Sequence, residues 1–124
     1  RGRLRSRGLG DVYKRQLIDS AKDYVHRNYR SMDLGLDDTC KELGVSNSYF
    51  SSLFKKETGS SFVEYLTDYR MDKAARMLVE TDDKSYVIAQ NVGYADPNYF
   101  SYVFKRKYGV SPSRYRTEYE KNKV

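Results

Sequence analysis

From Leu17 onward, apolar residues recur at intervals of three and four positions, which is the spacing of amphipathic helices. No stretch alternates convincingly with a period of two, so we expect an all-α domain without β-strands. Residues that begin or end helices divide the pattern into about seven segments. The predicted helices cover about 17–30, 36–43, 47–58, 62–79, 85–92, 97–108 and 112–119.

Three helix starts carry clear signals. Ser46 can cap a helix by accepting a hydrogen bond from a backbone N–H group. Asp96 followed by Pro97 combines a cap with a proline in the first turn, where the missing N–H group costs nothing. Ser111 followed by Pro112 repeats this signal for the last helix.

A pattern of eleven residues occurs twice. Residues 49–59 read YFSSLFKKETG, and residues 99–109 read YFSYVFKRKYG. Each copy follows a short predicted helix that ends before a glycine, Gly44 or Gly93. A short helix, a glycine-containing turn and a capped helix form the helix-turn-helix (HTH) plan. We therefore predict a first HTH at about 36–59 and a second HTH at about 85–109, joined by a long linker helix at about 62–79.

The second helix of each HTH separates into an apolar face and a polar face. An apolar back with a small-polar front suits insertion into the major groove of DNA, about 12 Å wide, where Ser, Asn and Tyr can reach base edges. A lysine at the end of the front can bind a phosphate. The predicted front holds Ser48, Ser51, Ser52 and Lys55 in the first HTH, and Asn98, Ser101, Tyr102 and Lys105 in the second.

Further cations lie beside these lysines, among them Lys56 and Arg106. Cations near a helix C-terminus are also stabilised by the helix dipole, by about 0.3–1 kcal/mol, without any DNA. Because two matched basic clusters adjoin two matched polar faces, we interpret them as phosphate contacts. Arg114 and Arg116 either add to this surface or belong to a solvated last helix.

The linker helix bears on the form of the DNA site. About 18 residues at about 1.5 Å each give roughly 27 Å, which suits two recognition helices separated by about one turn of DNA, about 34 Å. The two HTHs differ in sequence, so we expect an asymmetric site with two segments about one helical turn apart. Three serines in the first HTH predict weak direct readout there, and Asn98 and Tyr102 predict stronger readout in the second.

The first sixteen residues, RGRLRSRGLGDVYKRQ, differ from the rest of the chain. They resemble the in-frame translation of a sequencing adaptor, so we interpret residues 1–16 as disordered or non-native and residues 17–124 as the domain. The alternative is a natural basic arm that binds DNA. Without these residues the formal charge falls from +6 to +1, with 17 Lys and Arg against 16 Asp and Glu. Basicity of the whole chain is therefore no argument for a nucleic-acid partner.

The residues needed for catalysis or metal binding are scarce. Cys40 is the only cysteine and His26 the only histidine, so no nucleophile–base pair, disulfide or metal set can be assembled. We expect Cys40 to be buried for packing and His26 to lie at the surface. We predict no enzyme activity, cofactor, metal or membrane span, and a cytoplasmic location.

Residues 36–116 resemble the AraC/XylS-type DNA-binding domain, in the order and spacing of both halves. The preceding AKDYVHRNY is similar to the first helix of YesN-like response regulators. Cys40 departs from the small residue usual there, although a thiol fits the same space. Carried over by position, the resemblance implies base contacts from the polar residues listed above, with Tyr99 nearby.

The resemblance also bears on the whole protein. It implies a transcription regulator whose N-terminal receiver domain is missing, or alternatively a regulator with a small-molecule-sensing domain. A helical protein-interaction module that docks onto RNA polymerase is another alternative. Its faces to test would be Asp37, Asp38 and Glu42, and the turn at 80–83.

Overall fold

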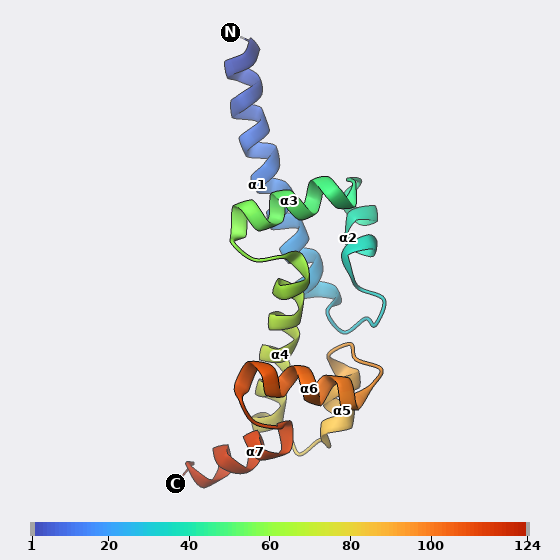
Figure 1. Ribbon diagram of the computed structural model, residues 1–124, viewed down its shortest axis with the longest axis vertical. Helices are drawn as coiled ribbons and strands as arrows, with labels where there is room; N and C mark the ends of the chain where they lie inside the picture. Colours follow the sequence, from blue (N-terminus) through green and yellow to red (C-terminus); the bar gives the residue numbers. More distant parts are fainter. Residues whose placement is uncertain (1, 124) are drawn as a thin grey trace. The chain divides into compact units, whose positions relative to one another are not determined.

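The computed structural model describes the backbone of residues 2–123 and the side chains of residues 10–123 (Figure 1). Seven helices and no strand occur in this part of the chain, which confirms the all-α prediction. All helices except the first begin and end within two residues of the predicted bounds. They are α1 (Gly2–Asn28), α2 (Leu36–Leu43), α3 (Asn47–Thr58), α4 (Phe62–Glu80), α5 (Ser85–Asn91), α6 (Pro97–Tyr108) and α7 (Pro112–Lys121).

The first helix differs from the prediction because it begins at Gly2 rather than at Leu17. Extending an existing helix avoids the cost of nucleation, and the high helix propensity of Arg, Leu, Lys and Gln offsets the low propensity of Gly8 and Gly10. None of the side chains described between Gly10 and Gln16 is buried, so this extension adds nothing to the core. The core contribution of α1 begins at Leu17, which is 5% exposed. The origin of residues 1–16 stays a prediction.

The chain forms two compact units. The N-terminal unit comprises residues up to 28 together with 34–65, and the C-terminal unit comprises residues 29–33 and 66 onward. Helix α4 passes from one unit into the other. Among the described residues, no helix is both long and apolar enough to cross a membrane.

Three phenylalanine rings form the centre of the N-terminal unit. Phe50, Phe54 and Phe62 lie 5.4–5.6 Å apart between ring centroids, and each is at most 2% exposed. Tyr65 packs edge-on against Phe54, with 5.6 Å between the centroids. Leu17, Ile18, Ala21 and Val25 of α1 are also buried in this unit, so α1 supplies one face of its core.

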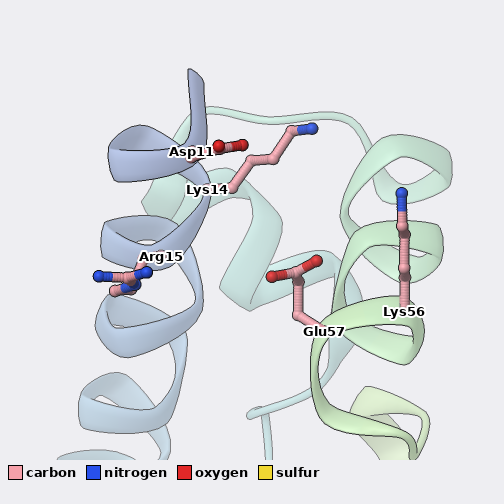
Figure 2. Close-up of a pocket in the computed structure, with 5 residues that line it drawn as sticks. All are labelled: Asp11, Lys14, Arg15, Lys56 and Glu57. Carbon is pink, nitrogen blue, oxygen red and sulfur yellow. The ribbon is translucent and has the colours of Figure 1, made fainter. Parts of the chain in front are cut away.

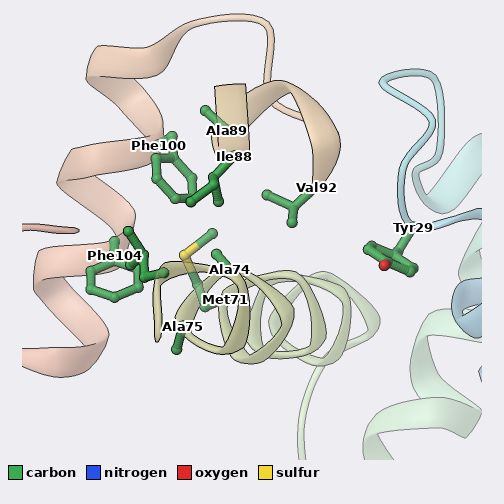
Figure 3. Close-up of a cluster of buried hydrophobic side chains, with 10 residues drawn as sticks. Tyr29, Met71, Ala74, Ala75, Ile88, Ala89, Val92, Phe100 and Phe104 are labelled. Carbon is green, nitrogen blue, oxygen red and sulfur yellow. The ribbon is translucent and has the colours of Figure 1, made fainter. Parts of the chain in front are cut away.

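The C-terminal unit has a core of the same kind (Figure 3). Phe100 and Phe104 of α6 are fully buried, with Met71 of α4 and Ile88 of α5 in the same cluster. Tyr115 packs edge-on against Phe104 at 5.4 Å, as Tyr65 does against Phe54. The internal repeat therefore extends past the eleven matching residues to the helix that follows each HTH.

Candidate nucleic-acid interface

The ends of the two recognition helices, α3 and α6, are fixed as the sequence predicts. The Ser46 hydroxyl accepts a hydrogen bond from the Tyr49 N–H group at 3.2 Å, and the Asp96 carboxylate accepts one from the Asn98 N–H group at 2.9 Å. Each helix ends at a glycine with positive φ whose N–H group donates to the carbonyl four residues earlier. Both helices therefore span twelve residues with matching phase.

The apolar back and polar front that the pattern predicts are both present. Nine of the eleven predicted contact residues are exposed, including Tyr99 at 55% and Tyr102 at 56%. Ser51 and Ser101, which occupy the same place in the repeat, are only partly exposed. The exposed residues are Ser48, Ser52, Lys55, Lys56, Asn98, Tyr99, Tyr102, Lys105 and Arg106.

The structure separates the basic residues into two groups. Within the described part of the chain, Lys55, Lys56, Lys105 and Arg106 form no ion pair. Lys107, by contrast, lies 2.7 Å from a carboxylate oxygen of Asp72 in α4. The side chains of the first group are therefore exposed and outside any ion pair, whereas the ion pair of Lys107 holds α6 against α4.

The two arginines of α7 also have partners in the protein. Arg116 Nε donates to the Leu78 carbonyl at 2.8 Å, and its Nη2 donates to the Thr81 and Asp83 carbonyls at 3.1 and 2.7 Å. These carbonyls lie at and beyond the end of α4, so Arg116 holds that helix end. Arg114 pairs with Glu118 one turn away. Arg116 therefore has a structural role that the sequence did not predict, and its contact with DNA stays a prediction.

A row of aromatic rings lies along α6. The ring centroids of Tyr94 and Tyr99 are 6.0 Å apart, and those of Tyr99 and Tyr102 are 6.3 Å apart. Burial raises the pKa of Tyr94, which keeps its phenol neutral. Tyr94 is not among the predicted site residues, because it precedes the recognition helix. The signal that could have found it is an aromatic residue directly after the turn glycine, at the place where the first HTH has Val45.

A cleft in the N-terminal unit brings α1 near the end of α3 (Figure 2). Asp11, Lys14 and Arg15 of α1 line it together with Lys56 and Glu57 of α3. The lining therefore mixes charges of both signs and contains one predicted phosphate contact, Lys56.

Cys40 and His26 fit the non-catalytic roles expected for them. Cys40 is 1% exposed, and burial raises the pKa of its thiol, as expected for a packing residue rather than a nucleophile. His26 is exposed, with its Nε2 2.8 Å from the Tyr65 hydroxyl. The described residues contain no group of three His, Cys, Asp or Glu side chains placed to hold a metal ion.

The acidic residues at the start of α2 have structural partners. Asp38 accepts a hydrogen bond from the Tyr24 hydroxyl at 2.8 Å, and Asp37 accepts one from the Asn47 side chain. The pair thus connects α2 to both α1 and α3, rather than forming a catalytic dyad.

The chain has two capped recognition helices, and each follows a short helix and presents a polar front. This arrangement defines a double HTH domain. A family model described as a helix-turn-helix domain matches residues 39–118. The chain belongs to this family, in its AraC-type form, which comprises the DNA-binding domains of transcription regulators. The family binds double-stranded DNA and is not a family of enzymes.

Solved structures of response regulators resemble the chain. The C-terminal domain of the response regulator yesN from Fusobacterium nucleatum is 36% identical, with a TM-score of 0.76 over 77% of this chain and 93% of that one. The C-terminal domain of AraT, a response regulator from Geobacillus stearothermophilus, is 39% identical, with a TM-score of 0.81 over 82% of this chain and 84% of that one.

Among curated relatives, the lactose operon transcription activator of Staphylococcus xylosus is 36% identical over 80 residues, which are 64% of this chain and 28% of that protein. A response regulatory protein of Staphylococcus epidermidis is 32% identical over 86 residues, which are 69% of this chain and 32% of that protein. The chain thus spans about a third or less of these relatives.

Proposed function

We propose that the chain is the output domain of a two-component response regulator and binds an asymmetric double-stranded site through α3 and α6 in successive major grooves. The observation that carries this proposal is the matched pair of exposed polar fronts, each ending in two cations that form no ion pair within the described residues. The two-segment form of the site is supported by the internal repeat, which gives the chain two recognition helices of equal length.

The proposed roles divide along each recognition helix. Residues near the N-terminus of a recognition helix contact base edges, and residues toward its end contact the backbone. We accordingly assign base contacts to Ser48, Ser52, Asn98 and Tyr102, with smaller contributions from Ser51, Ser101 and Tyr99. We assign phosphate contacts to Lys55, Lys56, Lys105 and Arg106.

The origin in a response regulator is supported by the resemblance to the yesN and AraT C-terminal domains over most of their length. On this proposal a receiver domain precedes the chain in the whole protein. The second candidate is a regulator whose preceding domain senses a small molecule, and the resemblance to a relative named as a lactose operon transcription activator is in keeping with it. The two candidates share the same DNA-binding domain and differ only in their input.

A contact with RNA polymerase is a further part of the proposal. Asp37 and Asp38 are engaged by Asn47 and Tyr24, which leaves Glu42 and the turn at 80–83 as the more available acidic surface. We would therefore test the polymerase contact first at Glu42.

Selection from a random pool of DNA duplexes tests the proposal. The full chain and a chain starting at Leu17 are compared at about 150 mM salt, because the six basic residues of the first sixteen can add non-specific binding. We expect both chains to enrich one asymmetric site with two segments about 10 base pairs apart. Folded protein that enriches no site would contradict the proposal. A symmetric site would contradict the assignment of one recognition helix to each segment.

A further inference from the structure

The recognition helices carry different chemistry at two matched positions of the repeat. Helix α3 has Ser52 and Lys56, whereas α6 has Tyr102 and Arg106 at the same offsets. Arg106 Nη1 donates a hydrogen bond to the Tyr102 hydroxyl at 3.1 Å, and the guanidinium carbon lies 5.8 Å from the Tyr102 ring centroid. Serine has no ring on which a cation could lie, so the first HTH has no equivalent of this Tyr–Arg pair (Tyr102 and Arg106).

A series of aromatic contacts connects the Tyr–Arg pair to the core of the same unit. Arg70, which is 7% exposed, lies 5.3 Å from the Tyr94 ring centroid. Tyr94 packs against Tyr99, and Tyr99 packs against Tyr102. Each ring restricts the rotamers of the next one, so the Tyr–Arg pair has less side-chain freedom to lose when it binds a ligand.

We propose that Tyr102 and Arg106 bind DNA as one coupled pair, and that this pair gives the second HTH most of the sequence discrimination of the domain. The inference rests on the proposed function. Arg106 stands in the last turn of α6, where its planar fork binds a backbone phosphate through two parallel hydrogen bonds. Tyr102, one turn nearer the start of the helix, faces the base edges.

The hydrogen bond within the pair sets the direction of the Tyr102 hydroxyl. The hydroxyl oxygen accepts from Arg106, so its own hydrogen points elsewhere and donates to an acceptor on a base. Holding the guanidinium on the phosphate thereby fixes the position of the phenol in the groove. In the first HTH, Lys56 is a flexible point charge and Ser52 reaches only a short distance, so this coupling is missing there.

The experiment measures dissociation constants by fluorescence anisotropy, using the full chain, the duplex that the wild type selects and a scrambled duplex. The variants Y102S and R106K place the residues of the first HTH in the second, and Y102S/R106K combines them. S52A, K56A and S52A/K56A form the matched control series in the first HTH. All four positions are exposed, so we expect unchanged thermal unfolding in every variant.

We expect Y102S and R106K each to weaken binding to the selected duplex by about tenfold, as for the loss of a hydrogen bond to a charged group. Because the pair acts together, the double variant should bind the selected duplex about 10- to 20-fold more weakly than the wild type. Two independent tenfold effects would instead multiply to roughly 100-fold. In the control series the two effects should multiply. We also expect R106A to reduce the slope of log K against log salt by about 0.9, the value for one phosphate.

Several results would overturn the inference. A roughly 100-fold loss in Y102S/R106K would mean that the two residues act independently, and wild-type affinity in both single variants would mean that neither matters. An unchanged salt slope in R106A would remove the phosphate contact. Equal binding of wild type to the selected and scrambled duplexes would instead count against the proposed function, so the two failures can be distinguished.

Discussion

Gly93 offers a quantitative test of the packing that supports the second HTH. Its φ is +96°, and a Cβ atom added there would lie 2.6 Å from the Tyr29 carbonyl oxygen and 2.8 Å from Arg70 Nη2. That carbonyl accepts from Arg70 Nε at 3.0 Å, and Arg70 Nη2 donates to the Ser31 carbonyl at 2.7 Å. The substitution Gly93→Ala must therefore displace a buried guanidinium together with the backbone that it binds.

The cost of Gly93→Ala has two parts. An L-residue at positive φ costs about 1–2 kcal/mol. Losing one hydrogen bond between a charged group and a carbonyl costs about 1.5–3 kcal/mol more. The sum, about 2.5–5 kcal/mol, is a large part of the roughly 5–15 kcal/mol that stabilises an ordinary domain.

Gly44 is the matched control because it occupies the same place in the first HTH. Its φ is +72°, and a Cβ atom there would meet nothing within 4 Å. Gly44→Ala should therefore cost only the backbone part, about 1–2 kcal/mol. Urea denaturation followed by circular dichroism measures both free energies of unfolding. Equal losses in the two variants would refute the argument, because they would show that the contact with Arg70 adds nothing to the backbone cost.

Three further predictions follow from single contacts. Arg116→Ala should lower the free energy of unfolding by about 1–3 kcal/mol, because three carbonyls near the end of α4 lose their donor; an effect confined to DNA affinity would contradict this structural role. Partial burial opposes ionisation of Asp72, but hydrogen bonds from Lys107 and Tyr108 outweigh it and lower the Asp72 pKa. This stabilisation is present above the pKa of an unfolded aspartate, about 3.9, and is lost as pH falls through the lower folded pKa. Lowering the pH should therefore reduce the free energy of unfolding more in the wild type than in Asp72→Asn. Parallel curves of the free energy of unfolding against pH would contradict this prediction. Cys40 should react with an aromatic disulfide reagent only at the rate of unfolding, because its thiol is buried and its pKa is raised; rapid reaction in the folded state would show an accessible thiol.

Local signals along the chain were sufficient to predict the helices of both HTHs. Ser46, Asp96 and the terminal glycines act on backbone groups within four residues, so their effect can be read from the sequence alone. The interaction partners of the basic side chains could not be predicted in this way. Lys107 and Arg116 find their partners 33 to 39 residues away in sequence, and only the packing of α6 and α7 against α4 brings those groups together.

The helical extension of α1 escaped prediction for a different reason. Residues 1–16 lack an apolar stripe. The absence of such a stripe indicates that a segment does not pack against a core, but it does not exclude a helix. A helix that already packs through Leu17 and Ile18 can continue into such a segment because extension needs no new nucleation, even though Gly8 and Gly10 lower the propensity of the segment.

Comparing the two copies of the repeat position by position distinguishes residues that are kept for packing from residues that differ at the surface. The two fully buried phenylalanines of each recognition helix are identical, Phe50 with Phe100 and Phe54 with Phe104, and the tyrosine rings that cover them from the next helix also match. The exposed front keeps its shape but changes its chemistry, most clearly where Ser52 is matched by Tyr102. A scaffold that repeats while its proposed contact residues differ presents two dissimilar surfaces at equivalent places. This difference agrees with the proposed asymmetric DNA site, in which the segment assigned to α6 is read more strictly than the segment assigned to α3.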